Sequence, residues 1–72
     1  MAVQLTPFMK QDAQKCLLDR IRRVAAMCST EIDDVALEWH RFELSCLRWE
    51  YNEVLADIVS EVTFADVFAR IQ

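Results

Sequence analysis

Apolar residues follow two different helical faces in the second half of the chain. The first apolar face advances by three and four residues in turn, and its members are Ile32, Val35, Trp39, Phe42, Cys46 and Trp49. The second apolar face has similar spacing, and its members are Leu44, Leu47, Tyr51, Leu55, Ile58 and Val62. At about 100° per residue, the two faces lie more than about 100° apart around one helix. One neighbouring helix therefore cannot cover both.

The first half of the chain predicts one amphipathic helix, from about residue 7 to residue 27. Thr6 and Pro7 are typical of an N-cap and a first helical position. The residues before them, 1–5, carry no such signal and are expected to be frayed. Residues that share the helix's apolar side recur at helical spacing, and they are Ala13, Leu17, Ile21, Val24 and Cys28.

A second helix is predicted from about residue 31 to residue 62, because no Gly or Pro interrupts that stretch. Thr30 and Asp33 have the spacing of a capping box at its start. At about 1.5 Å per residue, the first helix is long enough to cover the second only to about residue 52. We therefore expect the first apolar face to form the seam of an antiparallel hairpin, with Trp39 and Phe42 in the core.

A short third helix is predicted from about residue 64 to residue 71, after a capping box of Thr63 and Asp66. We favour a bend before it over a continuation of the second helix. The second apolar face would then extend beyond the hairpin and leave apolar side chains for a partner. The candidate partner-binding residues are Trp49, Tyr51, Leu55, Ile58, Val62, Phe64 and Phe68.

Composition supports an all-α fold, an antiparallel helical hairpin with a short third C-terminal helix. The chain has 72 residues, which is one domain covering 1–72, and it contains no Gly and one Pro. Apolar residues make up 54% of it, which is more than so small a helical unit can bury. Excess apolar surface on a small chain is typical of a protein interface.

Charge is divided unevenly along the chain. Residues 1–28 hold five basic and two acidic side chains, residues 29–72 hold three basic and ten acidic ones, and the net charge is −4. An acidic protein is a poor ligand for nucleic acid, so none is expected as a partner. Glu50, Glu53, Asp57 and Glu61 recur at helical spacing as an acidic ridge. Both a solvated face and a docking surface for a basic partner fit that ridge.

Catalytic, cofactor and metal sites are not predicted, and the chain is not expected to be an enzyme. His40 and Glu43 alone supply too few ligands for a metal. The three cysteines lie on apolar helical faces and are expected to be small buried side chains. No apolar run reaches the roughly 20 residues of a membrane span, so insertion into a membrane is not expected. The N-terminus also lacks the pattern of a signal peptide, and a cytoplasmic location is therefore expected.

The predicted layout resembles the small helical-hairpin co-chaperones of type III secretion systems. The resemblance rests on a first helix, a short polar turn and a longer second helix that opens with the acidic stretch Glu31-Ile32-Asp33-Asp34. It covers residues 8–62 by length and pattern, and it transfers no functional residue. It implies a chaperone that pairs with a helical-repeat partner and shields an apolar surface of the needle subunit.

Two other kinds of binding protein fit the same pattern. One is a small phage or mobile-element protein that inhibits a host regulator by binding it. The other is a regulator that pairs with a second copy of itself as a dimeric helical bundle.

Overall fold

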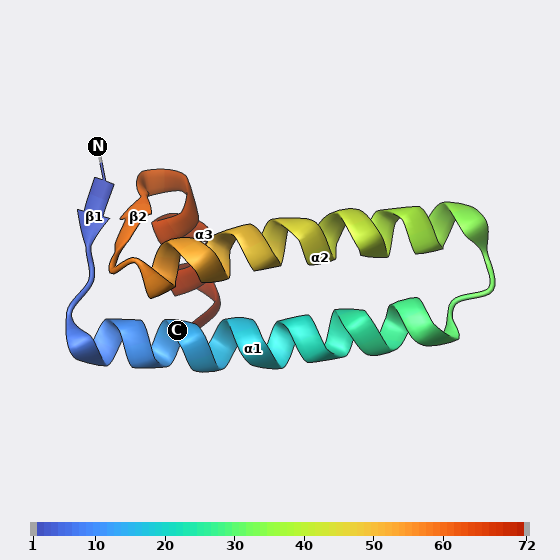
Figure 1. Cartoon of the computed structure of the whole chain (residues 1–72), viewed down its shortest axis with the longest axis horizontal. Coiled ribbons are helices and arrows are strands. Elements are labelled where there is room, and N and C mark those ends of the chain that lie inside the picture. The colour runs from blue at the N-terminus through green and yellow to red at the C-terminus, as the bar shows by residue number, and fades with distance from the viewer. Residues whose placement is uncertain (1, 72) are drawn as a thin grey trace.

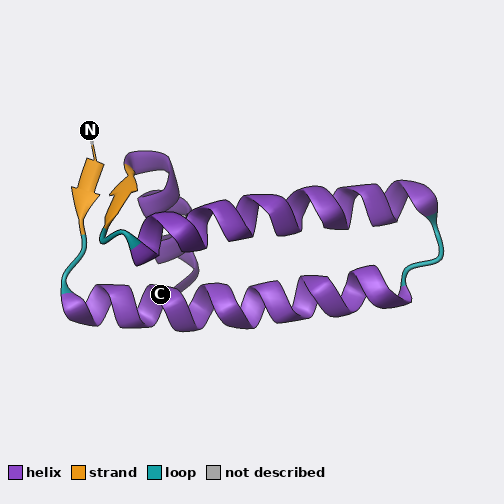
Figure 2. Cartoon of the chain, viewed as in Figure 1, coloured by secondary structure: helices purple, strands orange, loops and turns teal. Residues whose placement is uncertain are grey.

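Two long antiparallel helices make up most of the molecule. The computed structural model describes the backbone of residues 2–71 and the side chains of residues 2–69. Its elements in order are β1 (Ala2–Gln4), α1 (Pro7–Thr30), α2 (Asp34–Leu55), β2 (Ile58–Ser60) and α3 (Glu61–Ile71). Figures 1 and 2 show the hairpin of α1 and α2, with the strands and α3 gathered at its open end. The predicted all-α hairpin with a short third helix is confirmed, and the strand pair is a small addition to it.

Local signals set the limits of α1. The Thr6 hydroxyl accepts a hydrogen bond from the Met9 amide at 3.2 Å, and Pro7 is the first helical residue, as predicted. At the other end, the Ser29 and Thr30 hydroxyls donate to carbonyls one turn back, and the helix continues to Thr30. The hydroxyl of Thr30 is thus used by α1, which ends three residues later than predicted.

The turn between the helices differs from the predicted capping box of Thr30 and Asp33. Asp33 is itself the N-cap of α2, without a side-chain cap bond. The Glu31 carboxylate organises the turn instead, because its Oε1 accepts from the amides of Ile32 and Asp33 at 3.1 and 3.0 Å. α2 therefore begins at Asp34, not at residue 31.

The hairpin seam uses a face of α2 that differs from the predicted one. Residues turned toward α1 are buried or half-buried and also recur at three- and four-residue steps, and this packed face consists of Leu37, His40, Leu44, Leu47, Tyr51 and Val54. Leu47 is 2% exposed, whereas Trp39 is 67% exposed. Every member of the first apolar face is exposed. The prediction that this face forms the seam, with Trp39 and Phe42 in the core, was therefore wrong.

Side-chain size explains which face packs inward. α1 offers a narrow surface in which Ala13, Leu17 and Val24 are at most 2% exposed, as its predicted apolar side requires. Packed helices approach to about 8–10 Å, and the side chains at the contact set that distance. Four of the six residues on the packed face are leucine or valine and permit a close approach, whereas two tryptophans and a phenylalanine would hold the helices apart.

α2 ends at Leu55, seven residues before the predicted end at Val62. Asp57 follows with φ 68°, in the left-handed region that few residues other than Gly adopt and in which Asp is enriched. Two contacts hold this bend: the Leu5 amide donates to the Asp57 carbonyl at 2.9 Å, and Lys10 Nζ lies 2.8 Å from the Asp57 carboxylate. Since this chain has no Gly, the usual signal for such a bend is missing.

The reversed chain forms β2, which pairs antiparallel with β1 and places Val3 opposite Val59. Residues 2–4 are therefore a strand, not a frayed end. α3 follows at Glu61 instead of residue 64, because the N-cap is Ser60, whose hydroxyl accepts from the Thr63 amide at 3.2 Å. The capping box predicted for Thr63 and Asp66 is not the start of the helix, although the predicted bend before it is present.

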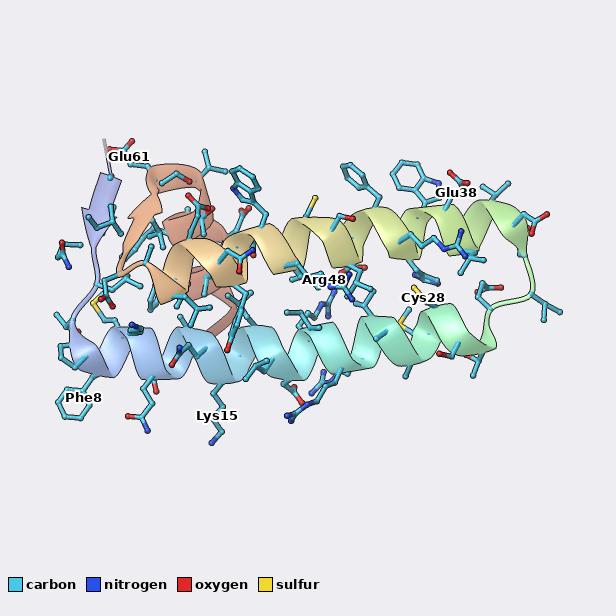
Figure 3. The ribbon with its side chains drawn as sticks, in the orientation of Figure 1. Phe8, Lys15, Cys28, Glu38, Arg48 and Glu61 are labelled. Carbon is cyan, nitrogen blue, oxygen red and sulfur yellow. The ribbon has the colours of Figure 1, made fainter. Side chains whose placement is uncertain are left out.

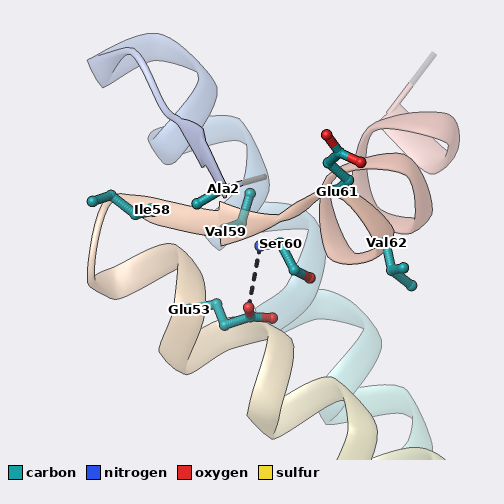
Figure 4. Close-up of a pocket in the computed structure, with 7 residues that line it drawn as sticks. All are labelled: Ala2, Glu53, Ile58, Val59, Ser60, Glu61 and Val62. Carbon is teal, nitrogen blue, oxygen red and sulfur yellow. Dashed lines mark hydrogen bonds between the residues drawn. The ribbon is translucent and has the colours of Figure 1, made fainter.

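One carboxylate of α2 holds this junction between β2 and α3. Glu53 Oε1 accepts from the Ser60 amide at 3.2 Å, as Figure 4 shows, and Glu53 Oε2 accepts from the Thr63 hydroxyl. Hydrogen bonds to a charged group are stronger than neutral ones, especially where Thr63 is buried. The start of α3 is thereby fixed against the last turns of α2.

The core is concentrated at the open end of the hairpin. Leu5, Val54, Val59 and Val67 meet there, and Ala13, Leu17, Val24 and Leu47 continue the core between the helices. Residues 25–46, all of which the structure describes, contain no fully buried side chain. The closed end of the hairpin therefore has no core of its own.

The two faces of α2 predict opposite responses to truncation. We expect Leu47→Ala to lower the free energy of unfolding by about 2–5 kcal/mol, because it opens a cavity in the seam. Trp39→Ala should lower it by less than about 1 kcal/mol, because its ring is largely in solvent already. Urea unfolding followed by circular dichroism measures both. Equal losses would mean that the first apolar face is buried in solution.

Candidate protein-binding face

The first apolar face forms a continuous exposed surface along α2. Val35, Trp39, Phe42 and Trp49 are 64–70% exposed, and from Val35 to Trp49 the face extends for about 21 Å at about 1.5 Å per residue. In Figure 3, the labelled Glu38 lies on the edge of α2 that points away from α1, whereas Arg48 extends toward α1. The apolar face is thus on the outside of the hairpin.

Two aromatic rings form the centre of this face. The centroids of Trp39 and Phe42 are 6.5 Å apart and their planes meet at 88°, which is the edge-to-face arrangement that aromatic quadrupoles favour. Together with Val35 and Glu38 they line a shallow hollow. Large rings with few rotatable bonds lose little conformational entropy on binding, which is why such residues dominate the energetics of many interfaces.

A second hollow continues the face onto α3. Trp49 and Cys46 reach it from α2, and Val62 and Asp66 reach it from α3. Val62 is 72% exposed, so it extends the apolar surface beyond Trp49, the last residue of the first apolar face. The bend at Asp57 is what brings Val62 back beside Trp49, since a straight α2 would carry it away.

The predicted partner-binding residues are divided between this face and other places. Trp49 and Val62 lie together at the second hollow. Leu55 and Ile58 are about half exposed, but Leu55 is about 120° around α2 from Trp49. Ile58 lines a separate hollow beside the strands, at the opposite end from Val62 (Figure 4).

The remaining predicted residues pack inward. Tyr51, Phe64 and Phe68 are half-buried against the core, and the rings of Phe64 and Phe68 stack with centroids 4.7 Å apart. These three side chains stabilise the junction of α3 with the hairpin. They do not contribute to the outer surface of α2.

Five residues of the face were assigned to the hairpin seam by the sequence reasoning and so were missed as candidates, and they are Ile32, Val35, Trp39, Phe42 and Cys46. A signal for them existed. The packed face has the same three- and four-residue spacing, but His40 interrupts its apolar character. His40 lies 3.6 Å from the Glu31 carboxylate on that side. Extending the second apolar face back from Leu44 through His40 to Leu37 would have shown that this face, too, can line the whole hairpin.

The acidic ridge is not a single surface. Glu50 is 9% exposed, and the Glu53 carboxylate is hydrogen-bonded to the start of α3. Asp57 lies beyond the end of α2 and pairs with Lys10, and Glu61 begins α3. Because α2 stops at Leu55, the helical spacing of the four acids no longer places them on one face.

Other candidate chemistry gives no further site. Cys46 is exposed on the first apolar face, contrary to the expectation of a buried thiol, while Cys16 and Cys28 are half-buried. Within residues 2–69, no three side chains of the metal-binding types come together. None of the described helices is both long and apolar enough to cross a bilayer. Comparisons with protein families, with curated proteins and with solved structures each find no match.

Tryptophan fluorescence tests the exposure of the face directly. Because Trp39 and Trp49 are the chain's two tryptophans and both are exposed, we expect the folded protein to emit at nearly the wavelength of the urea-unfolded chain. Acrylamide should quench both states to a similar extent. A strongly blue-shifted, protected emission at all concentrations would contradict the exposed face, and a shift that grows with concentration would reveal self-association.

Proposed function

We propose that this chain is a non-enzymatic protein-binding module and that the first apolar face, extended by Val62, is its docking surface. The observation that carries the proposal is the exposure of Trp39, Phe42 and Trp49 on one side of one helix. Monomeric proteins rarely leave a contiguous apolar patch of this kind in water unless it binds something. An enzyme is not proposed, because the face offers large apolar rings and few groups that could carry out chemistry.

The energetics favour a partner that covers the rings. Burial of apolar surface contributes about 25 cal/mol per Å², and a large aromatic side chain can bury about 150–250 Å². The rings project from a rigid helix and not from a loop, so little order has to be gained on binding. A partner with a complementary apolar surface is stabilised in turn, because binding shifts its equilibrium away from the unfolded or aggregated state.

Shielding of this kind is what a chaperone or co-chaperone does. The hairpin itself agrees with the resemblance to type III secretion co-chaperones, but α2, with 22 residues, is shorter than α1, with 24, and the acidic stretch lies mostly in the turn before α2. The partner proposed for that role is a helical-repeat chaperone or a secretion subunit in the cytoplasm. An inhibitor that caps a host regulator would use the same surface in the same way. Both roles require the outer side of α2 and no contribution from α1.

Matched charge substitutions test the docking surface. Phe42→Glu should leave the free energy of unfolding within about 0.5 kcal/mol of the original, since the site is solvated. It should weaken partner binding by about 2 kcal/mol or more, as expected for a central aromatic anchor. Phe8→Glu is the control, because Phe8 is 81% exposed on α1 and points away from α2 (Figure 3).

The measurement begins with partners recovered from cells that make the protein and identified by mass spectrometry. Their affinities for the original chain, the Phe42→Glu variant and the Phe8→Glu variant are then determined by titration calorimetry. Equal binding by all three proteins would refute the proposal. Loss of binding by the Phe8→Glu variant alone would move the docking surface to α1.

A further inference from the structure

The spacing and the charged borders of the first apolar face define what can occupy it. We infer that the occupant is one amphipathic α-helix of another protein, with small or aliphatic residues in its centre and lysine or arginine along the edge that faces Glu38. This inference rests on the proposed function and specifies the chemistry of the partner.

The face has the spacing of a coiled-coil seam. In heptad notation Trp39 and Cys46 are at a positions, and Val35, Phe42 and Trp49 are at d positions, while Ile32 precedes them in the turn. Within α2 the pattern continues without a break for about two heptads. A partner helix with the same period can place side chains between these residues along the whole face, whereas a strand, with its period of two, cannot match it.

The position of the seam fixes where the partner helix lies. The packed face is displaced by five residues from the first apolar face, from Ile32 to Leu37, which is about 140° around the helix. In a closed three-helix bundle, each helix contacts its two neighbours in directions about 60° apart around its axis. The two seams of α2 are much farther apart than that, so a helix on the outer seam cannot also contact α1. The partner therefore lies nearly opposite α1, beside the Val62 end of α3.

The sizes of the seam residues restrict the partner's centre. Trp39, Phe42 and Trp49 are large knobs, and the edge-to-face contact between Trp39 and Phe42 fills the space between successive turns. Only small or aliphatic side chains opposite them leave room for a close helix approach. Alanine and leucine at the partner's a and d positions meet that requirement.

The borders of the seam are acidic. The positions beside it are Glu31, Ala36, Glu38, Glu43, Ser45, Glu50 and Asn52, and none of them is Lys or Arg. Glu38 is exposed and lines the first hollow, so it is available to a partner. Glu43 is paired with Arg20 at 2.9 Å, Glu50 is 9% exposed, and Glu31 accepts hydrogen bonds within the turn. Arg48 extends toward α1 (Figure 3). A helix with a basic edge gains attraction at Glu38, because such positions set partner choice in coiled coils.

A second copy of the chain is a poorer occupant. It would bring Glu38 against Glu43 of the other copy in a parallel pairing, and like borders against each other in an antiparallel one. Like charges at these positions are destabilising. Each copy would also need to accommodate the other's two tryptophans in the same narrow seam. Charge and size therefore both favour a different protein.

The probes are two synthetic peptides of three heptads each. Both carry alternating Ala and Leu at a and d; one has Lys and the other Glu at every e and g position. Like charges keep each peptide from associating with itself, and fluorescence anisotropy measures binding to the full chain. At low salt we expect the Lys peptide to bind about threefold more tightly, because Glu38 attracts its edge and repels that of the Glu peptide. The difference should shrink as salt is raised.

A charge reversal on the border provides the matched variant. Glu38→Lys should reduce the preference for the Lys peptide severalfold. Asp12→Lys, which makes the same change of net charge at an exposed position on α1, should reduce it far less. An equal effect of both substitutions would show that net charge, not the border of the seam, selects the peptide, and would overturn the inference.

Other outcomes separate this inference from the proposed function. If neither peptide binds, yet Phe42→Glu abolishes binding of the natural partner, the docking surface stands and the helical occupant is wrong. Equal affinity for the Lys and Glu peptides overturns the basic character of the partner. Sedimentation that shows a tight dimer, dissociated by Phe42→Glu but not by Phe8→Glu, makes a second copy the occupant instead.

Discussion

Everything in this molecule depends on the fact that α2 carries two seams about 140° apart and has one long neighbour. α1 packs against the mainly aliphatic seam, because Leu47 and Val54 allow it to approach closely. The aromatic seam is then left outside. Each large ring that stays in water loses about 1.5–3 kcal/mol of stabilisation that its burial would contribute, which is a large loss for a small domain. A partner that covers the rings, as we propose, would recover that energy.

A second dependence is the bend at Asp57. Without it, α2 would run on as a rod and residues 58–71 would have no surface to close against. With it, β2 pairs with β1, and Val59 and Val67 complete the core at the open end. The same bend determines the extent of the outer surface, since it returns Val62 to the side of Trp49. The backbone conformation of Asp57 therefore determines both the closure of the fold and the extent of the candidate site.

Much of the fold followed from the sequence, and the errors have identifiable causes. Thr6 and Pro7 marked the start of α1, and the absence of Gly and Pro correctly indicated long helices. The same absence hid the end of α2, because an aspartate adopts the left-handed conformation there and leaves no glycine to signal it. The three-residue strands were invisible, since pairs so short depend on contacts between residues far apart in sequence.

The proposed docking surface lies mostly on residues other than the predicted partner-binding ones. The presence of two apolar faces was correctly recognised, along with the inability of one helix to cover both. Which face packs inward could not be judged from spacing alone, since both have heptad-like spacing. The discriminating quantity was volume: Trp39 is too bulky for a close seam, and His40 can lie at a seam when Glu31 is near. Of the residues predicted to bind a partner, Trp49 and Val62 lie on the proposed docking surface.

The uneven placement of the core gives the two ends of the hairpin different mechanical character. The open end is tied by strands, by the Glu53 carboxylate and by most of the buried side chains, whereas residues 25–46 have none that is fully buried. Segments with few buried contacts open locally at a small fraction of the global free energy. A partner that binds Val35 and Trp39 would suppress that local opening. Amide exchange at the closed end of the hairpin would then slow on complex formation. The open end would stay rigid, and the closed end would change from locally opening to ordered.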